Sequence, residues 1–159
     1  MVDTIEMNSE QIVVFSIDGQ DYALLLEGVR RVVHAVEIRE LPTAPKVILG
    51  VINVKGEIIP VASIRKILNL KASRIHPDDN FIIADTGTRI IAVHVDSVKG
   101  IELINKQLVT EAKKNIPDSG PLKGIANTEN GLILIYDLEK FLSHEDEVAL
   151  DNALSEIQK

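Results

Sequence analysis

The chain has 159 residues, of which 45 % are hydrophobic and 26 % charged, and its formal net charge is −7. A chain of this length buries enough surface for an ordinary globular fold, and this composition excludes wholesale disorder. The sequence has no cysteine and no tryptophan, which excludes a thiol nucleophile, a thiolate metal site and a disulfide. The negative charge and the scarcity of aromatic residues argue against nucleic-acid binding.

The sequence predicts no insertion into a membrane. Its longest stretch without an acidic or basic residue is Val47–Val54, far short of the about 20 residues that a spanning helix needs. The acidic start, Met1–Glu6, lacks the basic and then apolar pattern of a signal peptide. We therefore expect a cytoplasmic protein.

Strand signals dominate the first half of the chain. Isoleucine and valine together make up about a quarter of all residues, and such β-branched side chains pack well on pleated surfaces. The apolar runs Ile12–Ile17 and Tyr22–Leu26 flank an Asp-Gly pair, which predicts a β-hairpin. Two further strand-like runs lie within Gly50–Val61, and a short helix capped by Ser63 is expected over Ile64–Leu70.

The second half repeats this order. Phe81–Ala84 and Arg89–Val95 flank another glycine turn, and Gly124–Ile135 echoes the earlier pair of runs. The repeat predicts two related β units, about 10–72 and 78–143. Each unit offers about five short strands, enough to close a small barrel.

The C-terminal segment 144–159 has a helical pattern. Ser143 stands three residues before Asp146, an approximate capping box. Apolar residues follow at helical spacing, namely Leu150, Ala153, Leu154 and Ile157. We expect a C-terminal amphipathic helix that docks on its own barrels, with a partner-binding helix as the alternative.

A search for catalytic or metal-binding residues finds no convincing set. None of the histidines stands at metal-site spacing from another histidine or a carboxylate; they are His34, His76, His94 and His144. The adjacent Asp78 and Asp79 follow a proline and precede a strand, which favours a loop turn over a catalytic dyad. His94 lies in a strand-like run, where a solvent-facing or hydrogen-bonded histidine is expected. We therefore expect a binding or scaffolding protein that is not an enzyme and has no cofactor or metal.

The run Gly50–Val61, G-V-I-N-V-K-G-E-I-I-P-V, resembles the G-V-I-N-L-R-G-x-I-V-P-V signature of the CheW family of chemotaxis coupling proteins. The hairpin with Tyr22, the Leu41-Pro42 pair and the later Gly124 segment follow in the family's order. The resemblance implies a single CheW-like domain over residues 10–145. Its fold would be mostly β, with two SH3-like five-stranded barrels packed together, short helices and the C-terminal helix.

The resemblance also implies a function in chemotaxis signal transduction. Proteins of this family are non-enzymatic adaptors that join the cytoplasmic tips of methyl-accepting chemoreceptors to the regulatory domain of a CheA-type histidine kinase. That kinase domain is itself CheW-like, so barrel-to-barrel contacts are expected. Such a protein would be cytoplasmic and would associate with membrane receptor arrays through its partners.

Carried over residue by residue, the resemblance implies six partner-binding positions: Val29, Arg31, Gly50, Asn53, Lys55 and Gly56. Two of them depart from the family pattern. Lys55 replaces the signature arginine, which keeps the charge but loses the planar five-donor fork. Arg31 stands near a position where the family has a glutamate, so the charge is reversed. The two departures favour a divergent signalling array whose receptor contacts carry different charges.

Two alternatives stay open. One is a CheW-like adaptor of a non-flagellar chemosensory pathway that controls pili or gene expression. The other is a small-ligand-binding β-barrel, which would need internal polar clusters at alternating strand positions. The apolar runs of this sequence offer few such clusters.

Overall fold

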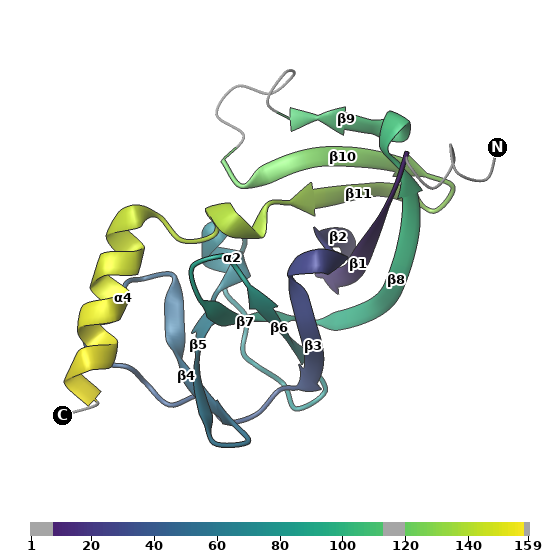
Figure 1. Ribbon diagram of the computed structural model, residues 1–159. Helices are drawn as coiled ribbons and strands as arrows, with labels where there is room; N and C mark the ends of the chain where they lie inside the picture. Colours follow the sequence, from purple (N-terminus) through teal and green to yellow (C-terminus); the bar gives the residue numbers. More distant parts are fainter. Residues whose placement is uncertain (1–7, 113–119, 158–159) are drawn as a thin grey trace.

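The computed structural model describes residues 8–112 and 120–157, which form two sheets with short helices around them (Figure 1). The first sheet, which we name barrel A, has the strand order β8-β1-β2-β11-β10-β9. Its strands are β1 (Ser9–Ile17), β2 (Gln20–Leu25), β8 (Ser97–Asn105), β9 (Val109–Glu111), β10 (Leu122–Thr128) and β11 (Gly131–Tyr136).

The second sheet, barrel B, has the strand order β3-β6-β7-β5-β4. Its strands are β3 (Val29–His34), β4 (Ile48–Val54), β5 (Glu57–Ala62), β6 (Asn80–Asp85) and β7 (Ile90–Val95). The described helices are η1 (Leu26–Gly28), α2 (Ile64–Ile67), η2 (Lys106–Leu108), η3 (Leu138–Lys140) and α4 (His144–Ile157). No helix in the described part of the chain is long and apolar enough to cross a membrane.

The two sheets have equivalent topologies. Barrel B becomes barrel A when β3, β6, β7, β5 and β4 are replaced in turn by β8, β1, β2, β11 and β10. Each sheet contains one parallel pair, β5 with β7 and β11 with β2, at equivalent places. The mostly β fold with a C-terminal helix is thus confirmed, and the order of elements repeats along the chain.

The strands are not divided between the sheets as the sequence analysis expects. The consecutive units 10–72 and 78–143 would each form a barrel, but their N-terminal hairpins are exchanged. Hairpin β1–β2 joins β8, β10 and β11, whereas hairpin β6–β7 joins β3, β4 and β5. Both hairpins are apolar on both faces. One face fills a barrel of the other unit, and the opposite face packs between the barrels.

Both sheets close in the same way. In barrel A the chain leaves edge strand β8, passes through η2 and returns as β9 to pair with β10 on the far edge. Because β8 and β9 act as one interrupted strand, the described part of barrel A has six strand segments instead of the expected five. In barrel B, Arg39 follows edge strand β3 and forms a bridge with Val51 of β4, with backbone N···O distances of 2.8 and 2.9 Å.

Among residues 8–112 and 120–157, three apolar clusters hold the fold together. One lies inside barrel A and contains Ile12, Val14 and Ile133, and one lies inside barrel B around Phe81. The largest lies between the barrels and is formed by side chains of both sheets, of η3 and of α4. The two barrels therefore share one continuous junction core, which is apolar and largely excluded from water.

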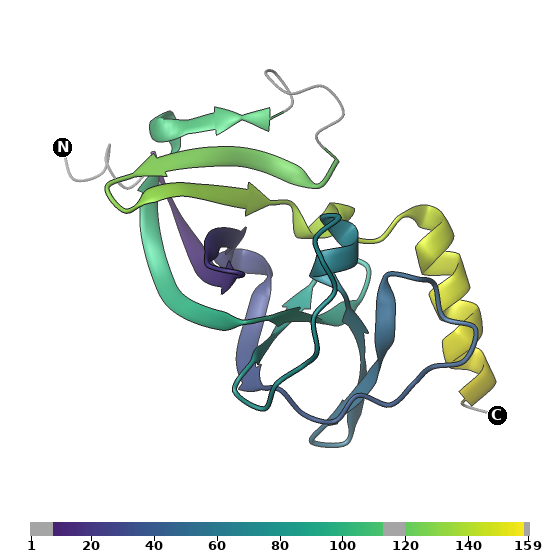
Figure 2. The ribbon, with the colours of Figure 1, turned by 180° about the vertical axis from the view of Figure 1, so that it is seen from behind.

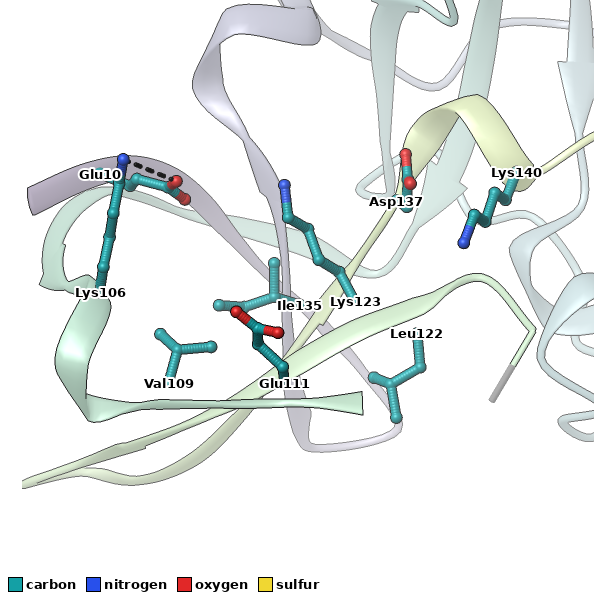
Figure 3. Close-up of a pocket in the computed structure, with 9 residues that line it drawn as sticks. All are labelled: Glu10, Lys106, Val109, Glu111, Leu122, Lys123, Ile135, Asp137 and Lys140. Carbon is teal, nitrogen blue, oxygen red and sulfur yellow. Dashed lines mark ion pairs between the residues drawn. The ribbon is translucent and has the colours of Figure 1, made fainter. Parts of the chain in front are cut away.

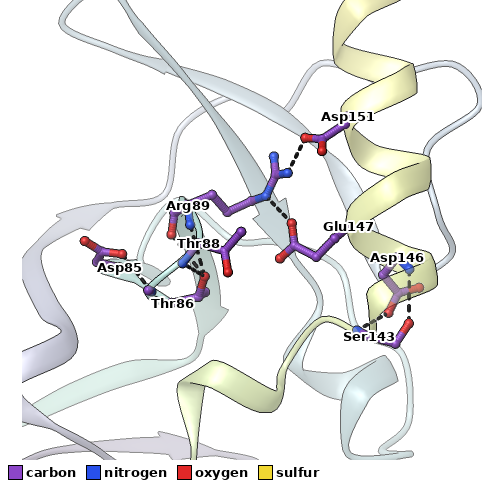
Figure 4. Close-up of polar contacts among 9 residues, drawn as sticks. Asp85, Thr86, Thr88, Arg89, Ser143, Asp146, Glu147 and Asp151 are labelled. Atoms are coloured by element: carbon purple, nitrogen blue, oxygen red, sulfur yellow. Dashed lines mark hydrogen bonds and ion pairs between the residues drawn. The ribbon is translucent and has the colours of Figure 1, made fainter.

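Helix α4 packs beside barrel B, as both views show (Figures 1 and 2). Leu150 and Ala153 are fully buried in the junction core, and Arg89 reaches the helix from the turn before β7 (Figure 4). The expected helix 144–159 is thus observed over His144–Ile157, and residues 158–159 lie outside the described part. It docks on its own chain, as expected.

Candidate partner-binding surface

The structure places the six partner-binding positions in two groups. Val29 and Arg31 lie on β3, at one edge of barrel B, and both are half-buried. The other four lie on β4 and in the β4–β5 turn, at the opposite edge in the strand order. They are Gly50, Asn53, Lys55 and Gly56. The two groups do not form one cluster of contacting side chains.

Three of these residues shape the backbone of β4 and its turn. Lys55 and Gly56 have φ angles of 51° and 88°, so both adopt the left-handed conformation that a tight hairpin needs. The N–H of Gly56 donates a 2.8 Å hydrogen bond to Oδ1 of Asn53. This geometry presents the side chain of Lys55 to solvent at the tip of the hairpin.

Gly50 lies where the chain crosses to close barrel B. Its φ of 152° is a conformation that side-chain-bearing residues rarely adopt. A Cβ atom there would collide with the carbonyl oxygen of Arg39 and lie 2.6 Å from Cγ2 of Ile38. Gly50 is buried, and the close approach of two backbones explains why a glycine stands at this position. Its contact with a partner stays a prediction.

Exposed apolar side chains point to an interaction surface that the sequence analysis did not identify. Val32 on β3 is 40 % exposed, and Ile101 and Leu103 on β8 are 59 % and 64 % exposed. β3 and β8 are equivalent strands of the two barrels. Ile101 and Leu103 are two residues apart, so they share one face of their strand. The sequence alone could not identify Ile101 and Leu103 as exposed, because this requires knowing which strand β8 pairs with.

One end of β8 contacts the strand next to β3, and the other end shares a hollow with the segment before β3. At one end, the N–H of Val98 donates a 3.3 Å hydrogen bond to Oδ1 of Asn80, whose backbone is paired with His34 of β3. At the other end, Glu27 before β3 and Lys106 after β8 line the same hollow of about 340 Å³. We call the exposed apolar side chains of these two strands, Val32, Ile101 and Leu103, the β3–β8 surface.

Basic residues flank the apolar part of the β3–β8 surface. Arg30 on β3 forms a 2.9 Å ion pair with Asp85, and Lys99 on β8 forms a 2.8 Å ion pair with Asp21. The Arg30 hydrogen bond, together with one from the N–H of Gly87, lowers the pKa of Asp85. These pairs lie at the protein surface, where they contribute little to stability.

A hollow of about 350 Å³ lies at one end of barrel A (Figure 3). Lysines and carboxylates alternate around an apolar floor; the lining residues are Glu10, Lys106, Val109, Glu111, Leu122, Lys123, Ile135, Asp137 and Lys140. Residues 8–112 and 120–157 contain no group of three histidine, cysteine, aspartate or glutamate residues that could hold a metal ion. Mixed charges of this kind do not identify a ligand class.

His94 and Asp79 form a buried pair within barrel B. Nε2 of His94 lies 2.7 Å from Oδ2 of Asp79, and the exposed fractions of the two side chains are 5 % and 11 %. Oδ2 of Asp79 also accepts a 3.0 Å hydrogen bond from the N–H of His76. The hydrogen-bonded state expected for His94 is therefore present, and Asp79 anchors the loop before β6 as expected of a turn residue.

Comparisons with known proteins agree on one family. A model of the CheW-like domain matches residues 11–146. The chemotaxis protein CheW of Thermotoga maritima is 26 % identical over 132 residues, which cover 83 % of this chain and 87 % of that protein. The chemotaxis protein CheW of Treponema pallidum is 22 % identical over 148 residues, covering 89 % of this chain and 87 % of that protein.

A solved structure shows the same architecture. The scaffolding protein TtCheW from Thermoanaerobacter tengcongensis is 28 % identical to this chain and superposes with a TM-score of 0.77. The match covers 86 % of this chain and 94 % of that chain. The likeness thus extends over both barrels, and the solved relative is described as a scaffold.

Proposed function

Because this chain belongs to the CheW-like domain family, we propose that it couples methyl-accepting chemoreceptors to a CheA-type histidine kinase in chemotaxis. The family consists of non-enzymatic scaffold proteins, which agrees with the solved relative. The protein is therefore an adaptor, and its function depends on surfaces that bind other proteins. We further propose that residues 10–145 act as a single domain that associates with receptor arrays through its partners.

The β3–β8 surface is the observation that best supports receptor binding. It exposes the apolar side chains of Val32, Ile101 and Leu103. Their exposure to water does not stabilise the folded monomer. An amphipathic segment with an apolar stripe, such as the tip of a receptor, would bury them. Val29 and Arg31 belong to the same strand. Val29 packs against the junction core, whereas Arg31 is adjacent to Val32 and therefore points to the opposite face of β3.

The β4–β5 hairpin suits the kinase. Lys55 is exposed at its tip, and Ile58 at the start of β5 is 49 % exposed. A regulatory domain that is itself CheW-like would meet this hairpin barrel to barrel. Asn53 and Gly56 then contribute by holding the turn that presents Lys55, and Gly50 by permitting barrel B to close.

Calorimetric titration with the regulatory domain of a CheA-type kinase from the same genome tests the adaptor role. We expect micromolar or tighter binding, which corresponds to about −8 kcal/mol. The Lys55→Glu variant is measured in parallel, with Lys140→Glu as a control that changes the net charge equally on an exposed residue of η3. Loss of binding in Lys55→Glu alone would assign Lys55 to the kinase face.

The opposite results would be equally informative. Retained kinase binding in Lys55→Glu would assign Lys55 to the receptor-binding face instead. No binding to any such kinase would contradict the adaptor role for this chain.

The charge of Arg31 gives a second prediction. If the cognate receptor carries acidic residues opposite Arg31, Arg31→Glu will weaken binding of that receptor's cytoplasmic tip, mainly through a slower association rate with altered salt dependence. The measurement is surface plasmon resonance at two ionic strengths, with Arg74→Glu as the matched control on an exposed loop. Unchanged or tighter binding of the tip to Arg31→Glu would reject the proposed charge complementarity.

A further inference from the structure

Arg65 is a buried cation at the junction of the two barrels. Its side chain is 4 % exposed, and its Nη2 donates hydrogen bonds of 2.8 Å to Asp18 and 3.1 Å to Asp96. We call these three residues the junction clamp. An arginine this deeply buried is normally paired, because burying an unpaired charge costs several kcal/mol.

The junction clamp connects elements of both barrels. Arg65 lies in α2, which follows β5 of barrel B, and Asp18 lies in the β1–β2 turn of barrel A. Asp96 is the single residue between β7 of barrel B and β8 of barrel A. Asp96 also holds the barrel A hairpin directly. Its N–H donates a 3.1 Å hydrogen bond to the carbonyl of Ser16, and its Oδ2 accepts a 2.9 Å hydrogen bond from the N–H of Asp18.

The clamp depends on both carboxylates. Nε and Nη1 of Arg65 are buried and have no hydrogen-bond partner among the described residues, so Nη2 makes all of the observed polar contacts of the guanidinium. Burial opposes the charge of Arg65, but the hydrogen bonds to Asp18 and Asp96 outweigh it and raise the pKa of the guanidinium. Removal of either acid leaves the buried charge with half of its partners.

The apolar core and the clamp make different contributions at the junction. Apolar burial brings the barrels together but has no direction, whereas hydrogen bonds to a planar guanidinium have a defined geometry. Asp96 immediately precedes β8, which carries Ile101 and Leu103. Asp96 is therefore held at the point where the chain passes from barrel B into β8.

We infer that Arg65 is a positioning residue that fixes the orientation of barrel A relative to barrel B, and thereby the spacing of β3 and β8 across the partner surface. The inference rests on the proposed receptor binding at the β3–β8 surface. It assigns the β4–β5 hairpin no dependence on the clamp, because that hairpin belongs to barrel B alone.

The orientation of the barrels can be measured without any partner. The chain has no cysteine, so Glu57→Cys and Glu129→Cys introduce two unique spin-label sites at exposed positions, one on each barrel. Double electron–electron resonance then reports the distance between the barrels. We expect a broader or shifted distance distribution in Arg65→Met. We expect the same in Asp96→Ala, which keeps the buried side chain of Arg65.

Asp151→Ala is the matched control. It also removes one carboxylate from an arginine that pairs with two, since Arg89 contacts both Glu147 and Asp151. That arginine tethers α4 instead of joining the barrels. The distance distribution in Asp151→Ala should therefore match that of the doubly labelled chain without further substitutions.

Binding separates positioning from general destabilisation. In Asp96→Ala and Arg65→Met we expect the receptor tip to bind about fivefold more weakly, while the affinity for the kinase regulatory domain stays within about twofold. A distance distribution and a receptor affinity that both equal those of the control would overturn the inference, as would equal losses for receptor and kinase. If the unmodified chain binds neither partner, the proposed function fails instead, and the distance measurement still decides the role of Arg65 in barrel orientation.

Discussion

Gly50 and Gly124 occupy equivalent places at the closure of the two barrels. Each lies at a register shift in a strand that meets the closing segment, β4 in barrel B and β10 in barrel A. A Cβ on Gly124 would lie 2.7 Å from Cγ1 of Val109 and 3.0 Å from the carbonyl oxygen of Thr110. Close approach of two backbones, which only glycine permits, therefore recurs in both halves of the molecule.

We expect Gly50→Ala to cost more stability than Gly124→Ala. At Gly50 the collision is with a backbone carbonyl and φ is 152°, so we expect a loss of about 2–4 kcal/mol in the free energy of unfolding. At Gly124 the closest atom belongs to a side chain that can shift, so a loss of about 1–2 kcal/mol is expected. Urea denaturation of both variants measures the difference.

Gly19→Ala is the control for backbone strain alone. Gly19 has a φ of 82° and no atom within 4 Å of the added Cβ, so about 1 kcal/mol is expected. A loss at Gly50 no larger than that at Gly19 would show that barrel closure tolerates a side chain there.

Asp79 makes the stability of barrel B depend on pH. Burial would raise its pKa, but hydrogen bonds from the N–H of His76 and from His94 outweigh burial and lower the pKa below 3.8. A carboxyl whose pKa is lowered in the folded state stabilises the fold fully above its unfolded value of 3.8. That contribution is lost as the pH falls through the lower, folded value.

Asp79→Asn should lower the free energy of unfolding by about 1–3 kcal/mol at pH 7. It should also flatten the decline in stability on acidification between about pH 5 and pH 3, because the titrating carboxyl is gone. Thermal denaturation across this range, with the exposed Asp78→Asn as control, measures both effects. If the stability of Asp79→Asn falls as steeply on acidification as that of the unmodified chain, Asp79 does not cause the pH dependence.

At the scale of elements, α4 combines a local start signal with a long-range tether (Figure 4). Ser143 and Asp146 exchange two 3.0 Å hydrogen bonds between backbone N–H and side-chain oxygen, which satisfies donors at the first turn. Arg89 donates a 2.6 Å hydrogen bond to Glu147 and contacts Asp151 one turn further along. The cap begins the helix, and the tether attaches it to barrel B.

Arg89→Met should loosen α4 without unfolding the barrels. Glu147 is largely buried but Asp151 is 67 % exposed, so solvent screening limits the expected loss to about 1–2 kcal/mol. Hydrogen exchange should become faster at the amides of α4 and stay unchanged in β1 and β7. Equal acceleration in the strands would mean that α4 and the barrels unfold as one unit.

At the scale of the whole molecule, the exchanged hairpins make the consecutive halves incomplete. A fragment 10–72 contains β3, β4 and β5 but lacks hairpin β6–β7, on which β3 and β5 depend for pairing. A fragment 26–96 contains all five strands of barrel B in one continuous stretch. A fragment should therefore fold if it contains all strands of one sheet, and not because it corresponds to one half of the sequence.

We expect fragment 26–96 to give more dispersed amide resonances than either 10–72 or 78–143. Its dispersion will fall short of the full chain, because the junction core loses the side chains of β1, β2 and α4. Two-dimensional NMR of the three fragments under one condition provides the comparison. A well-dispersed spectrum from 10–72 alone would contradict the dependence on exchanged hairpins.

Local features of the molecule could be predicted from the sequence. The Asp18-Gly19 and Lys55-Gly56 pairs predict tight turns, and all four residues have φ between 51° and 88°. Ser63 caps α2 through a 3.2 Å hydrogen bond from the N–H of Lys66, as expected, although the helix ends at Ile67 instead of Leu70. Such features depend on the backbone preferences of a few consecutive residues, so the sequence by itself determined them, together with the β-rich composition and the family resemblance.

Only the tertiary structure decided which hairpin completes which barrel. The repeat in the sequence is compatible with hairpins that stay in their own half or exchange, because both arrangements use the same strands and turns. The same limit applies to the junction clamp, whose partners are 47 and 31 residues apart in the chain, and to the Asp79–His94 pair at a separation of 15. Contacts between distant residues depend on packing of the whole chain, which no local pattern records.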